Sequence, residues 1–483
     1  MATYKTDKNI YDIVIGVEIH AQINTKSKLF SRSNTEFGAE PNSQVSLVDA
    51  ALPGMLPTLN KKAIKQAVKA GIALNGTINK TSIFDRKNYF YADLPQGYQI
   101  SQFSDPLVTG GYIDIVNEEE QHKRINLTRI HIEQDAGKSI HDQSPDQSFI
   151  DLNRSGIALM EIVSEPDLSS AFEVTEFIKK LRNILRYVDS CNADMEKGNL
   201  RCDANISLKL HGSSELGTRC EIKNLNSLKN ISLAIGYEIE TQAELLDNGG
   251  TVRQQTKLFN PNSMTTKVMR DKEDAHDYRY FPDPDLLPLV LEDEFIEQAK
   301  SEIGELPDSK KTRYISEYNI TEYDAEVIIA DRNNTDYFER ILGKCDIKLA
   351  VSWFTAELFG RLNKANINIT ESPVTPENLL ELIKLIENNT ISGKIAKDVL
   401  DKMFESTKSA IEIVKSEGLE QISDSAEIIN IIDKIINDNP EKVSEYKNGK
   451  DKLFGFFVGQ TMKATQGKAN PQIVNNLLKQ KLS

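Results

Sequence analysis

Apolar and polar residues alternate along residues 13–22 of the chain. Successive side chains of a β-strand point to opposite faces, so residues two apart share a face and lie about 7 Å apart. Glu18 and His20 fall on one side of such a strand. The apolar side consists of Ile13, Ile15, Val17 and Ile19. The pattern therefore predicts a strand on which two ionisable groups are neighbours.

Three later segments, residues 128–138, 200–208 and 217–227, repeat this arrangement. In each of them one predicted face is apolar and the other carries polar groups. The polar faces hold Arg129, His131, Glu133 and Asp135, then Arg201, Asp203, Asn205 and Ser207, then Arg219, Glu221 and Lys223. Gln134 falls on the opposite face from Glu133, and an extended run at 158–167 adds Glu161 and Glu165.

Two interpretations of these polar faces stay open. Such alternation is typical of an antiparallel sheet with one face in water. Solvated faces, however, are usually rich in Lys, Glu, Thr and Ser, whereas these carry Asp, Asn, Arg, His and Glu. Carboxylates that converge repel one another and require a cation, and oxygen donors with one or two imidazoles favour Mg²⁺ or Mn²⁺ over Zn²⁺. Arg86 and Lys87, beside an aromatic cluster that includes Tyr89, are further candidate phosphate contacts, although the aromatic residues could equally fill a core.

Helical periodicity predicts the covering elements and the domain division. Helices are expected at about 60–76, capped by Asn60, and at 170–189, each covering one side of the sheet. The proline-rich residues 281–289 cannot continue a helix or a central strand. We therefore expect an α+β fold in which residues 1–292 form a largely antiparallel sheet cradle with covering helices.

The rest of the chain is expected to be all-helical, with a middle domain at 293–408 and a small tail domain at 409–483. The clearest helix follows Thr375 as cap and Pro376 as first residue. The tail is predicted to end in a helical hairpin, with Asn470 and Pro471 starting its second helix.

Composition changes this picture only locally. The chain has 483 residues, 39% of them hydrophobic, and 72 acidic against 58 basic side chains, so as a whole it repels nucleic acid. Salt screens that repulsion beyond about 8 Å, so that a local basic patch decides binding. Residues 451–483 contain five lysines and one acid. This basic tail either binds nucleic acid or serves solubility.

The sequence excludes several familiar kinds of site and segment. The four cysteines form no C-x-x-C pair, which argues against a zinc knuckle. Gly137-Lys138-Ser139 resembles the end of a P-loop, but Ile132 stands where its first glycine belongs. There is no apolar run of about 18 residues and no charged-then-apolar leader, so we expect no membrane association and a cytoplasmic location.

Nine segments together resemble one family, the B subunits of the aspartyl/glutamyl-tRNA amidotransferases. They are "VIGVEIHAQINTKSKLFS", "FGAEPNS", "DRKNYFYADLPQGYQISQ", "HIEQDAGKS", "EIVSEPD", "LRCDANISL", "EIKNLNS", "DYRYFPDPDL" and "FGFFVGQTMKATQGKANPQIVNNLL". The resemblance implies that ATP and Mg²⁺ activate a glutamate or aspartate misattached to tRNA(Gln) or tRNA(Asn), and that ammonia then displaces the phosphate. It also implies two partners in a heterotrimer, an amidase-type glutaminase that is the family's A chain and a small protein that is its C chain.

The resemblance further implies roles for individual residues. Metal ligands are expected at Glu18, His20, Gln134 and Glu161, with Gln134 standing where some relatives have a second Glu. Catalytic roles are expected for Glu18, His20, Lys87, Glu133, Asp203 and Glu221, and nucleotide contacts for Lys87, Tyr89, Arg201, Asp203, Asn205 and Lys223. Lys463 and Lys468 are expected to bind tRNA. Two alternatives remain, a non-catalytic tRNA-binding scaffold and an unrelated metal-dependent hydrolase, and the sequence does not tell which tRNA is the substrate.

Overall fold

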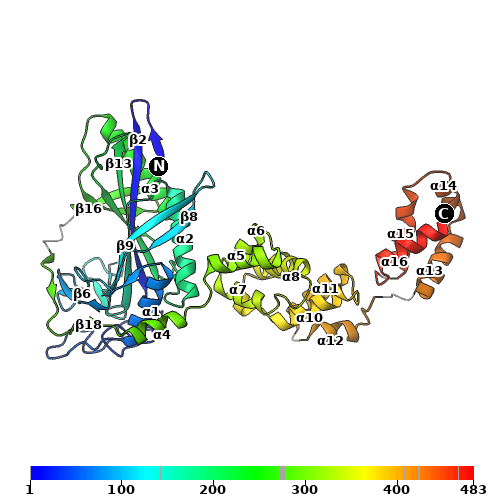
Figure 1. The fold of residues 1–483 in the computed structure, drawn as a ribbon, viewed down its shortest axis with the longest axis horizontal. Helices are drawn as coiled ribbons and strands as arrows, with labels where there is room; N and C mark the ends of the chain where they lie inside the picture. Colours follow the sequence, from blue (N-terminus) through cyan, green and yellow to red (C-terminus); the bar gives the residue numbers. More distant parts are fainter. Residues whose placement is uncertain are drawn as a thin grey trace. The chain divides into compact units, whose positions relative to one another are not determined.

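The computed structural model describes residues 2–141, 143–271, 278–406, 408–421, 425–465 and 467–482. The chain divides into two compact units, Met1–Pro307 and Asp308–Ser483. Figure 1 shows a sheet with helices in the first unit and helices in the second. This agrees with the predicted α+β class.

An 11-stranded sheet forms the body of the first unit. Its strands run in the order β16-β15-β14-β13-β2-β12-β9-β7-β3, with β1 paired to β2 and β8 paired to β9. All of these pairs are antiparallel except β14 with β15, which confirms the predicted largely antiparallel sheet. The strands are β1 Thr3–Lys5, β2 Ile10–Gln22, β3 Thr77–Ile78, β7 Val108–Thr109, β8 Tyr112–Val116, β9 His122–Gln134, β12 Ala158–Ser164, β13 Leu200–Leu210, β14 Cys220–Leu225, β15 Gln255–Asn260 and β16 Thr265–Asp271.

Three small sheets lie in the connections of the first unit. They pair β10 (Lys138–Ile140) with β11 (Phe149–Asp151), β5 (Asp85–Asn88) with β6 (Tyr98–Ser101) and β17 (Phe281–Pro282), and β4 (Thr81–Ser82) with β18 (Leu289–Val290). Pro282 ends the two-residue strand β17 at the edge of its sheet. The lack of an N–H group on proline explains why this segment stays short and peripheral.

Helices α2 (Ala171–Tyr187) and α3 (Leu228–Asp247) lie side by side along the sheet (Figure 1). Their apolar sides join the inward residues of the central strands in one core, for example Phe177 and Ile235 with Ile15 and Ala204. Helix α1 (Lys61–Ala73) adds to the same core. The Asn60 side chain accepts hydrogen bonds from the first-turn N–H groups of α1, which confirms the predicted cap. With its apolar face covered, the sheet has its polar side chains on the opposite face.

The first unit extends beyond the predicted boundary at residue 292. Helix α4 (Asp293–Ser301) packs against α1 and contributes the buried Ala299, with Phe295 and Ile296 beside it, to the first core. The division falls at Pro307 instead, because α4 has an apolar side that α1 covers.

The described part of the second unit is entirely helical, as expected. Thr375 caps α10 by accepting a hydrogen bond from the N–H of Asn378, and Pro376 is its first residue. The helices are α5 Pro307–Tyr318, α6 Glu322–Ile329, α7 Arg332–Glu339, α8 Ile347–Ser352, a π-helical segment Trp353–Leu358, α9 Phe359–Ala365, a 3₁₀ turn Ile369–Glu371, α10 Pro376–Glu387, α11 Gly393–Glu405, α12 Ala410–Ser416, α13 Ser425–Asn437, α14 Pro440–Lys447, α15 Leu453–Ala464 and α16 Pro471–Leu482.

Two separate cores occupy the second unit. The first includes Ala410, Ile413 and Val414 of α12, so the predicted boundary at 408/409 would cut through it. The second core begins with Ile428 of α13 and contains the predicted hairpin of α15 and α16. The tail is therefore shorter at its start than predicted, because α12 buries its apolar side among α10 and α11. Within the described residues, no helix has the length and hydrophobicity to cross a membrane.

Candidate functional site

The polar face of the sheet brings His20, Glu161 and His131 into one row. In the strand register, Glu161 of β12 lies opposite His20 of β2 on one side and opposite His131 of β9 on the other. Directly opposite residues of an antiparallel pair project on the same face. Glu161 Oε2 is 3.4 Å from His20 Nε2 and 3.5 Å from His131 Nε2. One carboxylate therefore lies between two imidazoles.

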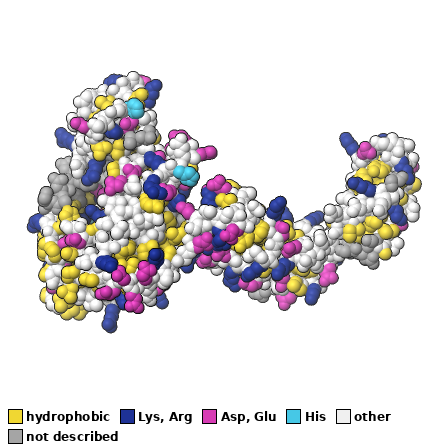
Figure 2. Space-filling view, in the orientation of Figure 1, with side chains coloured by type: hydrophobic (Ala, Val, Ile, Leu, Met, Phe, Trp, Pro, Cys, Tyr) yellow, Lys and Arg dark blue, Asp and Glu magenta, His cyan; other side chains and the backbone are white. Residues whose placement is uncertain are grey.

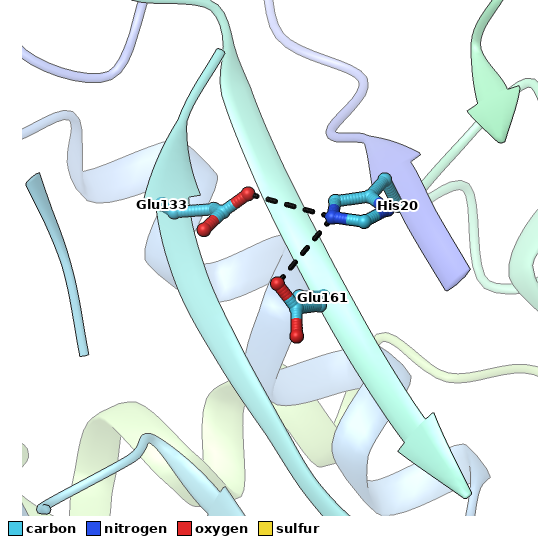
Figure 3. A group of neighbouring side chains, drawn as sticks. All are labelled: His20, Glu133 and Glu161. Atoms are coloured by element: carbon cyan, nitrogen blue, oxygen red, sulfur yellow. Dashed lines mark ion pairs between the residues drawn. The ribbon is translucent and has the colours of Figure 1, made fainter. Parts of the chain in front are cut away.

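Glu133 completes a cluster with His20 and Glu161 (Figure 3). One ligand atom from each of the three residues lies within 4.8 Å of the other two. Glu133 Oε1 is 3.8 Å from His20 Nε2, and its second oxygen accepts a hydrogen bond from Ser101 Oγ at 3.3 Å. Figure 3 shows the three side chains converging from three strands.

The charges in the cluster depend on one another. Burial alone would lower the pKa of the His131 imidazole, but Glu161 and Glu133 outweigh burial and raise it to about 9. The pKa of His20 is raised in the same way, since Glu161 and Glu133 overcome its burial. Burial opposes the charged form of Glu161 too, yet the two imidazoles hold its pKa well below the usual range. The charged form of Glu161 is thus stabilised by neighbouring positive charge, and Glu133 and Glu161 in turn stabilise that charge.

This donor set fits a divalent cation. The buried Glu133, the partly buried Glu161 and the His20 imidazole offer two hard oxygen donors and one nitrogen donor. A bound cation would take over the compensation that protonated imidazoles otherwise provide. Of the four predicted ligands, the structure brings His20 and Glu161 together in this cluster.

The other two predicted ligands lie elsewhere. Glu18 shares the face with His20 but lies opposite Asp203 of β13, and its Oε1 accepts a hydrogen bond from Asn205 Nδ2 at 2.9 Å. Gln134 pairs with Ala158, one register position beyond Glu133, so strand alternation directs its side chain to the opposite face. Glu133 therefore occupies the place in the cluster that was predicted for Gln134.

A second charged group continues the polar face onto β13 and β14. Lys223 Nζ is 2.5 Å from Asp203 Oδ2 and 3.3 Å from Glu221 Oε1. Burial opposes the charged form of Lys223, but Asp203 and Glu221 outweigh burial and raise its pKa, so the ammonium stays charged. Glu221 is oriented in turn by Thr256, whose Oγ1 donates to Glu221 Oε2 at 2.8 Å.

A cavity of about 1140 Å³ opens beside these groups, and His20, Arg201, Asp203 and Lys223 all line it. Arg201 donates from Nη2 to Asp135 at 2.9 Å, and Asp135 raises the pKa of the guanidinium. Its Nε is buried and has no hydrogen-bond partner within the described part of the chain. Among the described residues, Arg201 thus keeps one buried donor without a partner at the wall of the cavity.

Lys87 and Tyr89 come from β5 and the loop after it, and they are not in the lining of this cavity. Lys87 Nζ lies 4.8 Å from the centre of the Tyr278 ring and 5.8 Å from that of Tyr89. Burial disfavours the charged form of Lys87, but Tyr280, Glu133 and Glu161 outweigh it and raise the pKa. Lys87 thus belongs electrostatically to the carboxylate cluster. Tyr89 donates its hydroxyl to Gln99 Oε1 at 3.1 Å.

The two predicted tRNA contacts lie in the second unit. Lys463 is exposed in the last turn of α15, and the half-buried Lys468 lies in the loop between α15 and α16.

In the first unit, sequence reasoning placed His131 on the polar face but gave it no role in the site. The signal was its position two residues before Glu133 on the same predicted strand.

Comparisons with known proteins complete the description. A family model described as the GatB/GatE catalytic domain matches residues 13–297, and one described as the GatB domain matches residues 336–482. The chain is 58% identical over 482 residues to the B subunit of the aspartyl/glutamyl-tRNA(Asn/Gln) amidotransferase of Rickettsia felis, with both chains fully covered. It is also 58% identical to the proteins of the same name from Rickettsia rickettsii, with both chains fully covered, and Rickettsia typhi, with 98% of each covered.

Proposed function

The chain belongs to the GatB family, and from this membership we propose that it is the component that amidates Glu-tRNA(Gln), Asp-tRNA(Asn) or both. In this proposal ATP phosphorylates the side-chain carboxyl of the misattached amino acid, and ammonia then displaces the phosphate. The name of the relatives states both tRNAs, and their designation as B subunits implies an enzyme of several chains.

Amidation by way of an acyl phosphate requires a particular arrangement of charges in the site. A carboxylate does not react with ammonia unaided because its oxygen is a poor leaving group, whereas phosphate leaves readily once its charge is neutralised. Phosphoryl transfer is catalysed mainly by positioning and by electrostatic stabilisation of the phosphoryl oxygens. The site therefore needs carboxylates to hold a cation, and fixed cationic side chains for the phosphate.

The cluster of His20, Glu133 and Glu161, of which His20 lines the cavity, is the observation that carries the proposal. These three residues would hold Mg²⁺, which when bound supplies positive charge to the phosphate oxygens. Arg201 and Lys223 line the same cavity and donate to the phosphate. Asp203 and Glu221 fix the Lys223 ammonium, and Asn205 fixes the Glu18 carboxylate.

In this proposal a partner protein, and not this chain, produces the ammonia. We propose that the chain forms a heterotrimer with an amidase-type glutaminase and a small third protein, and that it is located in the cytoplasm.

Lys463 and Lys468 would contribute to tRNA binding. On the face shown in Figure 2, basic and acidic side chains are interspersed over the first unit, so tRNA affinity depends on local groups of lysines and arginines rather than on overall charge.

The test is Glu161→Gln in the full-length chain, co-expressed with an amidase-type partner. Because the amide keeps the shape and loses the charge, ATP-dependent phosphorylation and amidation of Glu-tRNA should fall at least about 100-fold, while tRNA binding and assembly are retained. Glu165→Gln is the matched control, since Glu165 lies just beyond the same strand and accepts a hydrogen bond from Thr128.

Two results would reject this assignment. Full phosphorylation by Glu161→Gln would favour the non-catalytic tRNA-binding scaffold. Turnover of small substrates by the isolated chain, without tRNA, would favour an unrelated metal-dependent hydrolase.

A further inference from the structure

Phe37 is an exposed aromatic ring in the lining of the cavity that also contains His20 and Lys223. The residue is 68% exposed, and the cavity also includes its neighbours Gly38 and Ala39. Most large apolar side chains of the first unit are buried in its core, so Phe37 adds little to folding. An exposed ring in the wall of a cavity that charged side chains also line is suited to contact a ligand.

The loop that carries Phe37 is held in place on both sides of the ring. The Gln44 side chain donates to the carbonyl of Glu36 at 3.0 Å, and Asn153 Nδ2 donates to the carbonyl of Glu40 at 2.7 Å. Asn153 Oδ1 also accepts a hydrogen bond from the N–H of Gln44 at 2.8 Å. Gly38 has a φ of +82°, a left-handed conformation that glycine adopts without strain. The backbone is thus fixed while the ring stays free.

Cationic side chains line the same cavity. Lys138 is exposed, and within the described residues no acidic group lies within ion-pair distance of its Nζ. Arg154 is held by the carbonyl groups of Ala136 and Gly137. The acidic lining groups are Glu36, Asp151, Glu196 and Asp203, of which Asp203 is neutralised by Lys223. An exposed ring and the Lys138 ammonium in the wall of one cavity match a base that is linked to a phosphate.

From this arrangement we propose that Phe37 stacks on the adenine of a substrate while Lys138 binds one of its phosphates. The inference rests on the proposed function. Two substrates of that reaction carry adenine, ATP and the single-stranded 3′ end of the tRNA, whose terminal nucleotide is adenosine. Unpaired bases are commonly bound by stacking on aromatic side chains. A cavity of about 1140 Å³ has room for a nucleotide together with the reacting carboxyl group.

The experiment uses the co-expressed complex of the full-length chain and its partner proteins, with ATP and Glu-tRNA varied separately. Phe37→Ala should raise the KM for one of these two substrates by about 5- to 100-fold, the effect of losing one base–aromatic stack, and leave kcat within about threefold. Phe37→Trp should restore the KM. Which KM changes identifies the source of the adenine.

Lys138→Ala supplies an independent measurement. It should raise the KM for the same substrate as Phe37→Ala and reduce the salt dependence of its binding by about one phosphate contact. Phe172→Ala is the matched control, because Phe172 is 40% exposed and lies at the start of α2, outside the cavity lining.

Three outcomes would overturn the inference. They are an unchanged KM for both substrates, the same change in Phe172→Ala, and loss of assembly in size-exclusion chromatography, which would make Phe37 a contact with a partner protein. In each of these cases the wild-type complex still amidates Glu-tRNA. A wild-type complex without that activity would instead reject the proposed function.

Discussion

His20 and Glu161 lie directly opposite each other on β2 and β12, with 3.4 Å between Nε2 and Oε2. The same carboxylate faces His131 of β9 at 3.5 Å. Three strands that are distant in the sequence therefore place one acid between two imidazoles. Because both charges of each pair are largely buried, removing the Glu161 carboxylate leaves Glu133, 3.8 Å from each imidazole, as the nearest compensating charge.

The first prediction distinguishes Glu133 from Gln134 as a metal ligand. Glu133→Gln should weaken binding of Mn²⁺ to the full-length chain by at least about tenfold, because it removes one carboxylate from the cluster. Gln134→Ala should leave the affinity unchanged, since strand alternation directs that side chain to the opposite face. Calorimetric titration with Mn²⁺ measures both variants. Weaker binding only in Gln134→Ala would restore the ligand set expected from the sequence.

The polar and apolar faces of individual strands were predictable from sequence alternation. Arg201, Asp203 and Asn205 share a face, and Cys202 and Ala204 face the core, as expected. Alternation depends only on local strand geometry, so it is visible in the sequence. The register between strands was not predictable, because it depends on how distant segments pack.

His131 and Glu133 show the consequence of that difference. Both belong to the predicted polar face of β9, yet their distances from Glu161 and His20 follow from the pairing of β9 with β12 and of β12 with β2. The division at Pro307 depends on packing in the same way. The apolar sides of α4 and α12 are visible in the sequence, but which core covers each of them is set by tertiary packing.

The second prediction concerns the buried ion pair between Lys28 and Asp49. Their side chains are 0% and 3% exposed, and Lys28 Nζ is 3.2 Å from Asp49 Oδ2. Burial lowers the pKa of Lys28, and Asp49 opposes that shift. Asp49 also accepts hydrogen bonds from Ser31 and from the N–H of Ser46, which joins the two ends of the segment between them.

Asp49→Ala should therefore cost about 3–5 kcal/mol in the free energy of opening this loop, because it leaves a buried ammonium unpaired. Hydrogen-exchange mass spectrometry of residues 29–50 measures the loss. Asp293→Ala is the control: its ion pair with Lys80 is 76% and 63% exposed, and its removal should cost less than about 1 kcal/mol. Equal costs for the two variants would show that the buried pair does not stabilise the loop.

The third prediction is a pH dependence in the second unit, centred on Glu339. Its Oε1 accepts hydrogen bonds from Lys310 Nζ at 2.7 Å, Arg313 Nη2 at 2.5 Å and Tyr314 Oη at 3.0 Å. Burial would raise the pKa of Glu339, but these donors outweigh burial and lower it. A lowered folded-state pKa gives stability that is present above the unfolded value, about 4.3, and is lost as the pH falls through the folded value.

Glu339→Gln should cost about 1 kcal/mol at pH 7, and the difference from wild type should shrink as the pH falls from 5 to 3. Fluorescence of Trp353, the single tryptophan of the chain, follows unfolding because the residue is buried in the same core as Tyr314. Glu326→Gln is the control, since Glu326 is 58% exposed beside Lys311. A difference that stays constant with pH would contradict the assigned role of the Glu339 carboxylate.

The last prediction decides between the two interpretations of the basic tail. Lys463 and Lys468 belong to the helical hairpin of α15 and α16, and within the described residues neither has an acid within ion-pair distance. Lys481 is the matched control, because its Nζ lies 2.8 Å from Asp433 and is already neutralised. If the tail binds tRNA phosphates, replacing both unpaired lysines by alanine should lower the affinity and reduce the slope of log K against log salt by about 1–2. Lys481→Ala should change the slope by much less, and both variants can be followed by filter binding of tRNA over a range of salt.

A truncation that accompanies them should begin at residue 422, since a cut at 410 would remove α12 from the middle core and confuse lost binding with unfolding. Identical slopes for wild type and the double variant would assign the lysines to solubility instead.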